Sequence, residues 1–412
     1  MKFSIPTNWD NRLIELIDTK NIEEFYGKMH SDYIGGGRSA YSCPPVRKRD
    51  AARHIRKIRS MGIRFNYLFN SACLGNEEYT APWQKQFERL TGWLVDNGVD
   101  TITVSVPYLL ERLKNRYPRL RVSVSAFAHV NTIHKALFWE NLGADEITPS
   151  PPELNRNFKG LQAIRAHVKC GLKLIVNNNC LLYCPLHIYH SNITAHASRL
   201  RETTTGFTID YCRINCRYLR LTDTSNFLKA DWIRPEDLHV YETIGVNTFK
   251  IVDRILSTEA IVKIASAYFA GKHEGNLLDL FPKTRDISVL RRNNMFHYFK
   301  YFFRPLFVNP FRLLGIKNLM DDIDIFIDNR ALDGFLENTM NKDCITRSCA
   351  ECGYCSRVAE QVVKIPAQAR EKLISAYRDF MNTLNHGDIF RYTPSLQAAR
   401  APSPGLSEKK RK

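Results

Sequence analysis

The chain has 412 residues, of which 44% are hydrophobic and 25% are charged, and its formal net charge at pH 7 is +17. This composition is typical of a globular protein, and no apolar run approaches the roughly 20 residues that a membrane-spanning helix needs. The sequence therefore predicts no transmembrane segment. The positive charge favours an anionic partner, either RNA or a small molecule that carries phosphate or carboxylate.

The chain begins MKFSIPTNWDNRLIELID, and polar residues interrupt each apolar run of this stretch. A secretory signal peptide needs a continuous apolar region, so the stretch does not resemble one. We therefore expect a cytoplasmic protein. In a reducing compartment its 11 cysteines are expected to bind metal, act in catalysis or be buried, rather than form disulfides.

From about residue 50 to residue 270, short β-type runs alternate with amphipathic stretches. The runs are RFNYLF, TITVSV, RVSVSAF, DEITPS, LKLIV and FKIVD, and segments such as NTIHKALFWENLG lie between them. Such alternation predicts a parallel sheet, either doubly wound or closed into a (β/α) TIM-like barrel. No G-x-G-x-x-G follows the early strands, which favours the barrel, complete or incomplete.

In a (β/α) barrel the loops after the strands gather at one mouth, where the chemistry takes place. His129 and Asn131 follow the run RVSVSAF, whereas Lys250 and Arg254 lie at or just beyond the end of FKIVD. The two cations would reach the mouth, where they could hold an anionic substrate or form salt bridges to neighbouring strand ends. We predict that Lys250, Arg254, His129 and Asn131 position the substrate.

Two C-x3-C pairs follow the run LKLIV. On a helix this spacing places two sulfurs on one face, one turn apart, so the pairs could together hold a 4Fe-4S cluster, with zinc as the alternative. Cys43 or Cys73 could replace Cys184 as the fourth ligand, and Cys184 and Cys212 could instead be core residues. A mixed site with His187, His190 or His196 also stays open. The predicted barrel ligands are Cys180, Cys184, Cys212 and Cys216.

A second cysteine group has the spacing C-x4-C-x2-C-x2-C. Three of its cysteines share one tight loop, as in bacterial ferredoxins, which favours a second 4Fe-4S cluster over zinc. Ser356 departs from the ferredoxin pattern, which has proline after the last cysteine. The predicted ligands are Cys344, Cys349, Cys352 and Cys355.

Four segments follow from these patterns. Residues 1–280 form the barrel, 281–330 a basic aromatic connection, 331–390 the cysteine-rich iron-sulfur unit with one helix, and 391–412 a disordered basic tail. Within the connection, residues 283–317 interleave Arg and Lys with Phe and Tyr. This segment could pack its aromatic rings on the barrel, stack on bases or lie at a lipid interface.

The stretch from Cys180 to Asp279 resembles the collagenase-like peptidase family, peptidase family U32, whose catalytic type is unassigned. The resemblance covers about residues 50 to 280, and the cysteine-rich end is similar to tails in one branch of the family. Its motifs are IRPEDLHVYETIGVNTFKIVDR and YFAGKHEGNLLDLF. The residues on which the resemblance rests are Ile233, Arg234, Pro235, Glu236, Asp237, Gly245, Val246, Lys250, Ile251, Asp253 and Arg254.

The resemblance implies an incomplete (β/α) barrel and, in members with this cysteine usage, a 4Fe-4S cluster bound by four cysteines. Several such members support oxygen-independent hydroxylation of the ubiquinone ring, of a transfer RNA wobble uridine or of a ribosomal RNA cytidine. Other members were named peptidases without an agreed nucleophile. In this chain Asn177, Asn178 and Asn179 stand where an acidic, glycine-bearing E-x-F-x-x-G stretch would precede the cysteine.

We therefore expect an enzyme that carries out an oxygen-independent redox or hydroxylation-type modification of an anionic substrate. The barrel cluster would lie near the substrate, and the terminal cluster would relay electrons from a donor protein. There are two alternatives. One is an RNA-binding protein with structural metal sites that uses residues 283–317 and the basic tail, and the other is a peptidase.

Overall fold

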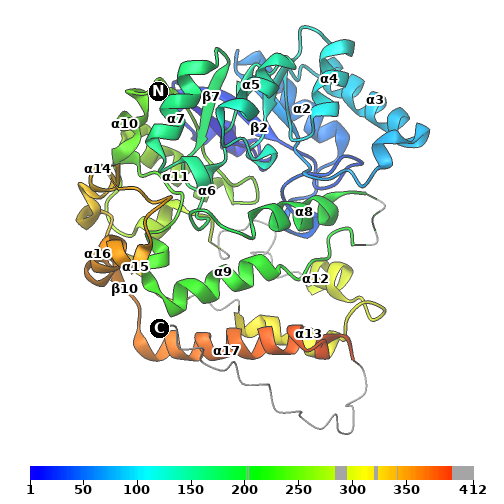
Figure 1. Cartoon of the computed structure of the whole chain (residues 1–412). Helices are drawn as coiled ribbons and strands as arrows, with labels where there is room; N and C mark the ends of the chain where they lie inside the picture. Colours follow the sequence, from blue (N-terminus) through cyan, green and yellow to red (C-terminus); the bar gives the residue numbers. More distant parts are fainter. Residues whose placement is uncertain (201, 203, 284–294, 320–322, 341, 392–412) are drawn as a thin grey trace.

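The computed structural model is built around a closed barrel of eight parallel strands, hydrogen-bonded to one another in chain order (Figure 1). It describes residues 1–412 except 201, 203, 284–294, 320–322, 341 and 392–412. The predicted fold class is confirmed, and the barrel is complete rather than incomplete. Its strands are β1 (Lys2–Pro6), β2 (Ile22–Gly27), β3 (Arg64–Phe69), β4 (Thr101–Val104), β5 (Arg121–Val124), β6 (Glu146–Ile147), β7 (Gly171–Ile175) and β8 (Thr248–Lys250).

Amphipathic helices cover the outside of the barrel. In α2, Ile55 and Ile58 are buried and lie one turn apart, which places the apolar face of the helix on the strands. Thr132 begins α5, because its hydroxyl accepts a hydrogen bond from the Lys135 backbone N–H. The helices up to residue 270 are α1 (Arg12–Leu16), α2 (Lys48–Ser60), α3 (Ala81–Asp96), α4 (Pro107–Arg116), α5 (Ile133–Asn141), α6 (Pro151–Leu154), α7 (Phe158–His167), α8 (His187–Ser198), α9 (Tyr211–Thr222), α10 (Leu238–Glu242) and α11 (Thr258–Ala270).

The first two strands precede the repeat that the sequence analysis recognised. β1 pairs with β2 on one side and with β8 on the other, so it closes the barrel. Phe3 and Ile5 of β1 lie at alternate positions, but the regular alternation of strand-type and helix-type runs begins only at about residue 50. The six predicted runs correspond to β3 through β8.

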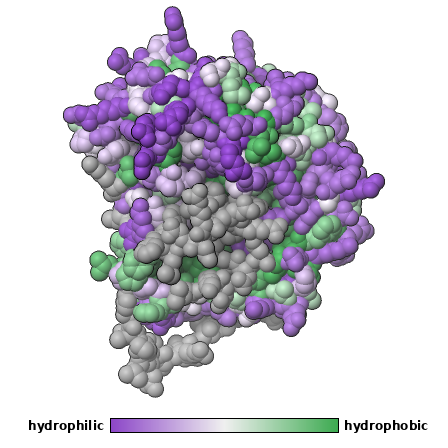
Figure 2. Space-filling view, turned by 180° about the vertical axis from the view of Figure 1, so that it is seen from behind, coloured by the Kyte–Doolittle hydropathy of each residue, from purple (hydrophilic) through white to green (hydrophobic). Residues whose placement is uncertain are grey.

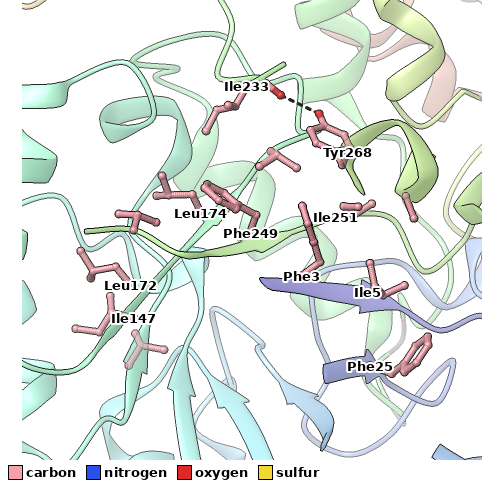
Figure 3. Close-up of a cluster of buried hydrophobic side chains, with 14 of the residues drawn as sticks. Phe3, Ile5, Phe25, Ile147, Leu172, Leu174, Ile233, Phe249, Ile251 and Tyr268 are labelled. Carbon is pink, nitrogen blue, oxygen red and sulfur yellow. Dashed lines mark hydrogen bonds between the residues drawn. The ribbon is translucent and has the colours of Figure 1, made fainter. Parts of the chain in front are cut away.

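Apolar side chains fill the space between the strands and the outer helices. Figure 3 shows Phe3, Ile5 and Phe249 in one such cluster, where strands β1 and β8 lie side by side. The Tyr268 hydroxyl on α11 donates a 2.8 Å hydrogen bond to the Ile233 carbonyl, so this buried phenol is satisfied. The cluster fixes α11 against the last strand, from whose carboxyl end the predicted substrate-binding cations emerge.

A second, smaller core lies beside the barrel mouth (Figure 1) and includes Val308 and Leu313, whereas Ile327, Phe335 and Val362 pack in the barrel core. The helix predicted from AQAREKLISAYRDFMNTL is confirmed as α17, and its Leu373, Tyr377 and Phe380 share a core with Ile214 and Leu221 of α9. α9 therefore lies between the barrel and α17. The remaining elements are α12 (Met295–Phe302), α13 (Pro310–Leu313), α14 (Phe335–Met340), α15 (Cys349–Cys352), α16 (Tyr354–Val362), α17 (Ala367–Asn385), and the antiparallel pair β9 (Phe326–Ile327) and β10 (Val363–Lys364).

The basic aromatic segment is only partly described, because residues 284–294 lie outside the described residues. Where it is described, the Phe302 ring contacts Tyr41 at 4.9 Å, whereas Phe299, Leu306 and Phe311 are exposed. Figure 2 shows a largely hydrophilic face over the upper part of the molecule, with apolar patches toward the lower part. No described helix combines the length and apolarity that a membrane crossing requires. The predicted disorder of the tail lies outside the described residues from 392 onward.

Candidate functional site

A cavity of about 340 Å³ opens at the carboxyl ends of the barrel strands. Tyr26 of β2, Leu68 of β3, Ile175 of β7 and Lys250 of β8 line its barrel side. Helices α8 and α9 lie across this mouth, as Figure 1 shows, and contribute side chains to the same cavity. Those that can carry chemistry are Arg38, Cys180, Cys184, His187, His190, Asp210, Cys212, Arg213, Cys216, Asp253 and Arg254.

All four predicted barrel cysteines line this cavity. Cys180 and Cys184 lie on the loop after β7, and Cys212 and Cys216 lie one turn apart on α9. Neither Cys43 nor Cys73 is among the described residues that line the cavity. The structure therefore brings together the two C-x3-C pairs, which are distant in sequence, and Cys184 is the cysteine that joins the other three.

Buried polar contacts fix the loop that carries Cys180. The Asp231 carboxylate accepts hydrogen bonds from the Cys180 backbone N–H at 2.8 Å and from the Asn178 amide at 2.7 Å. The Asn155 amide donates a 2.6 Å hydrogen bond to the Asp231 carbonyl. Burial raises the pKa of Asp231 to about 7, against the opposing effect of these hydrogen bonds. Asn178 therefore helps to hold the loop through Asp231.

Neighbouring groups perturb the thiols of the cavity. Burial raises the pKa of Cys212 to about 12, with further contributions from Asp210, Cys184 and Cys216. Burial also raises the pKa of Cys180, and so do the negative charges of Asp231 and Cys216. Metal binding would have to displace these protons, so the affinity of the thiols for a metal depends on pH.

Four thiols in one cavity are a donor set that either an iron-sulfur cluster or zinc can use. Within the described ranges, no group of three or more His, Cys, Asp or Glu side chains is already close enough to hold a metal ion. Four thiols nevertheless share one cavity, and the Arg220 guanidinium donates a 3.1 Å hydrogen bond to the Cys216 sulfur. A cluster spaces its four sulfurs further apart than one ion does, and hydrogen bonds to sulfur tune its reduction potential.

The terminal cysteines lie at and around α15 and are much more accessible. Cys344 and Cys349 are exposed, whereas Cys352 and Cys355 are half-buried. Burial raises the pKa of Cys344, and the charges of Cys349 and Cys352 raise it further, so these thiols are neighbours. Burial and then the charge of Cys344 raise the pKa of Tyr183 to about 12. Because Tyr183 belongs to the loop between Cys180 and Cys184, the two cysteine groups approach one another at this loop.

Lys250 and Arg254 lie in the cavity, as predicted, but they differ in their surroundings. The Lys250 ammonium group lies 3.9 Å from the centre of the Tyr26 ring, and burial lowers its pKa to about 7, helped by the nearby charge of Lys173. Arg254 is 4% exposed and donates a 3.1 Å hydrogen bond to the Lys28 carbonyl. Arg254 is thus a buried cation, whereas Lys250 is partly neutral at pH 7.

His129 and Asn131 lie at the edge of the site. The His129 ring contacts the His187 ring at 4.6 Å between centroids, and His187 lines the cavity. The Asn131 side-chain oxygen accepts a 2.8 Å hydrogen bond from Lys135. Both residues are absent from the described lining of the cavity, and of the two it is His129 that contacts a wall residue, His187.

The sequence analysis missed Arg38 and Asp210, which pair with two residues that it had named, Asp253 as a motif residue and His190 as a possible metal ligand. The Arg38 guanidinium pairs with Asp253 across the cavity, and the His190 ring nitrogen lies 3.2 Å from an Asp210 oxygen. Arg38 follows the three glycines at 35–37. A run of glycines indicates that the backbone passes close to other atoms, and this was the signal in the sequence that could have pointed to Arg38. At Gly37 an added Cβ would lie 2.3 Å from the Phe127 ring, so a side chain there would collide with the cavity wall.

The motif residues Arg234, Glu236 and Asp237 are structural. Arg234 is 2% exposed, pairs with Asp237 at 2.8 Å and donates a hydrogen bond to the Asn329 carbonyl. Glu236 accepts a 2.6 Å hydrogen bond from the His273 backbone N–H. This part of the motif therefore joins the barrel to the segment after it and does not line the cavity.

The chain is similar to one protein family and to individual known proteins. The family described as Peptidase family U32 matches residues 48–273, which include both C-x3-C pairs. The uncharacterized protease MJ1657 of Methanocaldococcus jannaschii is 30% identical over 334 residues, covering 81% of this chain and 87% of the relative. Among solved structures, the U32 peptidase Mk0906 aligns with a TM-score of 0.47 and 22% identity, covering 61% of this chain and 93% of the other.

Proposed function

The chain belongs to peptidase family U32, and we propose that it is an iron-sulfur enzyme that modifies an anionic substrate without molecular oxygen, by a redox or hydroxylation-type reaction. One observation carries the proposal, namely that Cys180, Cys184, Cys212 and Cys216 line the same cavity as Lys250 and Arg254. A redox group held by these thiols would lie beside a substrate bound by the cations.

The chain's own residues supply the binding and the environment. Cys180, Cys184, Cys212 and Cys216 would hold a 4Fe-4S cluster, which supplies one-electron chemistry when bound. Arg254 offers a buried guanidinium to a carboxylate or phosphate, and its desolvated position strengthens that contact. The helices α8 and α9 lie across the mouth (Figure 1) and contribute His187 and Cys216 to the cavity wall.

The terminal cysteines would hold a second cluster that passes electrons from a donor protein to the first. Exposure of Cys344 and Cys349 makes this group accessible to such a donor. Arg156 stacks on the Trp232 ring at 4.2 Å and is among the charges that act on Cys344 and Cys355. A buried cation beside thiolates favours their charged form, which metal binding requires. Zinc at either cysteine group is the alternative.

A peptidase is the second candidate, and one contact favours it. The His190 ring lies 3.2 Å from Asp210, and both residues line the cavity, so a base oriented by a carboxylate is present. In the described part of the chain, no Ser, Thr or Cys side chain is hydrogen-bonded to the other nitrogen of that ring. A peptidase mechanism also predicts peptide hydrolysis that survives the loss of iron.

The RNA-binding alternative stays a prediction. It depends on residues 283–317 and the basic tail, and the described structure omits 284–294 and 392–412. It would be favoured by RNA affinity that falls steeply with salt, together with zinc as the only metal.

Anaerobic purification followed by quantification of iron, acid-labile sulfide and zinc tests the proposal. We expect about eight irons and about eight sulfides per chain, each falling to about four in Cys180→Ala and in Cys352→Ala. Cys170→Ala is the matched control, because Cys170 is half-buried and lies outside both groups. Zinc without sulfide, or iron unchanged in Cys180→Ala, would contradict the barrel cluster. Peptide hydrolysis that is lost in His190→Ala and retained without iron would favour the peptidase.

A further inference from the structure

The floor of the cavity holds a lysine without an acidic partner. Lys250 ends β8, is 9% exposed and lines the cavity next to Tyr26. The Tyr26 hydroxyl donates its hydrogen bond to the Ile251 carbonyl at 2.9 Å, so only the ring of Tyr26 faces the amine. In the part of the chain that the structure describes, no hydrogen bond or ion pair reaches the Lys250 side-chain nitrogen.

The charged groups around Lys250 explain why it lacks a partner. Glu24 of β2 and Glu146 of β6 face the barrel interior, but Lys173 of β7 binds both, at 2.6 Å and 2.5 Å. Arg254, four residues after Lys250, adds a second cation. The acidic groups are thus bound by one lysine, while the other lies among like charges and is desolvated.

That environment gives Lys250 the character of a nucleophile. Burial, then the charge of Lys173, lowers its pKa to about 7, while Glu24 and Glu146 oppose the shift. About half of the amines are then neutral near pH 7, compared with well under one in a thousand for an ordinary lysine. Desolvation and a neighbouring cation are the two devices by which enzymes activate lysine toward carbonyl groups.

The cavity also contains unsatisfied polar groups that a substrate could satisfy. One Arg254 guanidinium nitrogen and the Asn70 side-chain oxygen are buried without a hydrogen-bond partner, and both residues line the cavity. A buried donor without a partner is costly, and in a cavity it indicates the place of a ligand acceptor. The guanidinium would take a carboxylate or phosphate, and the amide oxygen would accept from a hydroxyl or amine.

We propose that Lys250 is a catalytic nucleophile that forms an imine with the carbonyl group of a substrate whose carboxylate or phosphate is held by Arg254. The inference rests on the proposed function in one respect, since it places the substrate in the same cavity. The neutral amine attacks the carbonyl carbon and forms a C–N bond. The carbonyl oxygen then leaves as water with the two amine protons, so the step needs no oxidant or reductant. The imine withdraws electrons from the neighbouring carbon, which prepares the substrate for modification.

Reductive trapping tests the imine directly. The full-length, anaerobically purified protein is incubated with glyoxylate and cyanoborohydride at pH 7, digested and analysed by mass spectrometry. We expect Lys250 to be modified at least about tenfold faster than Lys263, which is exposed, because the neutral amine is the reacting form. Lys173 is the buried comparison and should remain unmodified, since both of its acidic partners hold it as a cation.

Two variants separate the nucleophile from the anion site. Lys250→Met should abolish the cavity label and leave the label on Lys263. Arg254→Gln should slow the reaction of Lys250 with glyoxylate about tenfold more than its reaction with acetaldehyde, which carries no anion and reports only the loss of a neighbouring cation. Glyoxylate labelling of Lys250 that is no faster than that of Lys263, or equally slowed reactions with both aldehydes, would overturn the proposal.

Iron analysis of the same samples distinguishes the two proposals. Iron and sulfide present without trapping at Lys250 would overturn the imine and leave the iron-sulfur function standing. Trapping at Lys250 in a protein without sulfide would overturn the iron-sulfur function and leave the imine standing. A half-maximal labelling rate near pH 7 would further support the imine, whereas a rate that keeps rising toward pH 10 would contradict it.

Discussion

Two buried lysines on neighbouring strands, Lys173 in the middle of the barrel and Lys250 at its mouth, have opposite surroundings. In the middle, Lys173 binds Glu24 and Glu146, and the Ser4, Asn66 and Ser123 side chains donate to the same carboxylates. At the mouth, Lys250 lies on an aromatic ring beside another cation. The first arrangement satisfies buried charge, whereas the second leaves an amine available for chemistry.

The comparison separates stability from function within one barrel. Removing a member of the satisfied network leaves buried charges without a partner, so it should be strongly destabilising. Removing the unpaired lysine relieves a desolvated charge, so it should be neutral or stabilising while it eliminates activity. Substitutions at the two levels should therefore differ in the sign of their effect.

The largest expected effect on stability follows from replacing Lys173 in the middle of the barrel. Lys173→Met should lower the free energy of unfolding by about 3–5 kcal/mol, because Glu24 and Glu146 lose their common cation. Urea denaturation at pH 7 measures this. The triple variant Lys173→Met, Glu24→Gln, Glu146→Gln removes the charges together and should recover much of the loss. A loss unchanged in the triple variant would show that packing, rather than charge, sets the effect.

The mouth should show an opposite, pH-dependent effect. Between its folded pKa of about 7 and the ordinary value of 10.5, Lys250 is protonated in the unfolded chain and largely neutral in the folded protein. The stability of the wild type therefore rises with pH across this window, and the cost of the buried cation is complete below pH 7. Lys250→Met should be more stable than the wild type by about 2–4 kcal/mol at pH 6, with little difference near pH 10.5. A constant difference between the two denaturation profiles would contradict this.

A smaller loss of stability is expected for Thr103, an uncharged member of the hydrogen-bond network around Glu24. Thr103 donates a 2.8 Å hydrogen bond to the Asn66 side-chain oxygen, and Asn66 in turn donates to Glu24. Thr103→Val preserves the shape but leaves that oxygen unsatisfied, at a cost of about 1–3 kcal/mol. Thr103→Ser, which retains the hydroxyl, is the control in the same urea titration. Equal losses in both variants would indicate that the methyl group, not the hydrogen bond, matters.

The smallest effect on stability is expected for Tyr26, whose ring lies next to Lys250. Tyr26→Phe removes the hydrogen bond to the Ile251 carbonyl but retains the ring beneath Lys250, so the loss should be about 1 kcal/mol. The pH profile of Lys250 labelling should be unchanged, because the ring and the nearby charges remain. Tyr26→Leu removes the ring as well. A profile that shifts in Tyr26→Phe would show that the phenol, rather than burial, controls Lys250.

The sequence determined the features that depend on local pattern. The strand and helix periods from residue 50 to 270, the strand-end positions of Lys250 and Arg254, the helix after residue 366 and the spacing of the cysteines are all properties of neighbouring residues. The family motifs also lie within continuous stretches. For this reason the barrel, the family and the association of cysteines with cations at one mouth were predictable.

Tertiary structure decided the features that depend on closure and register. β1 and β2 lie before the regular alternation of strands and helices, and it is their pairing with β8 and β3 that brings Glu24 to Lys173, 149 residues away in the chain. The same register leaves Lys250 without an acid and turns a predicted fixed cation into a partly neutral amine. Local sequence specifies which side chains can ionise, but their pKa values depend on burial and on neighbours that only the closed barrel supplies.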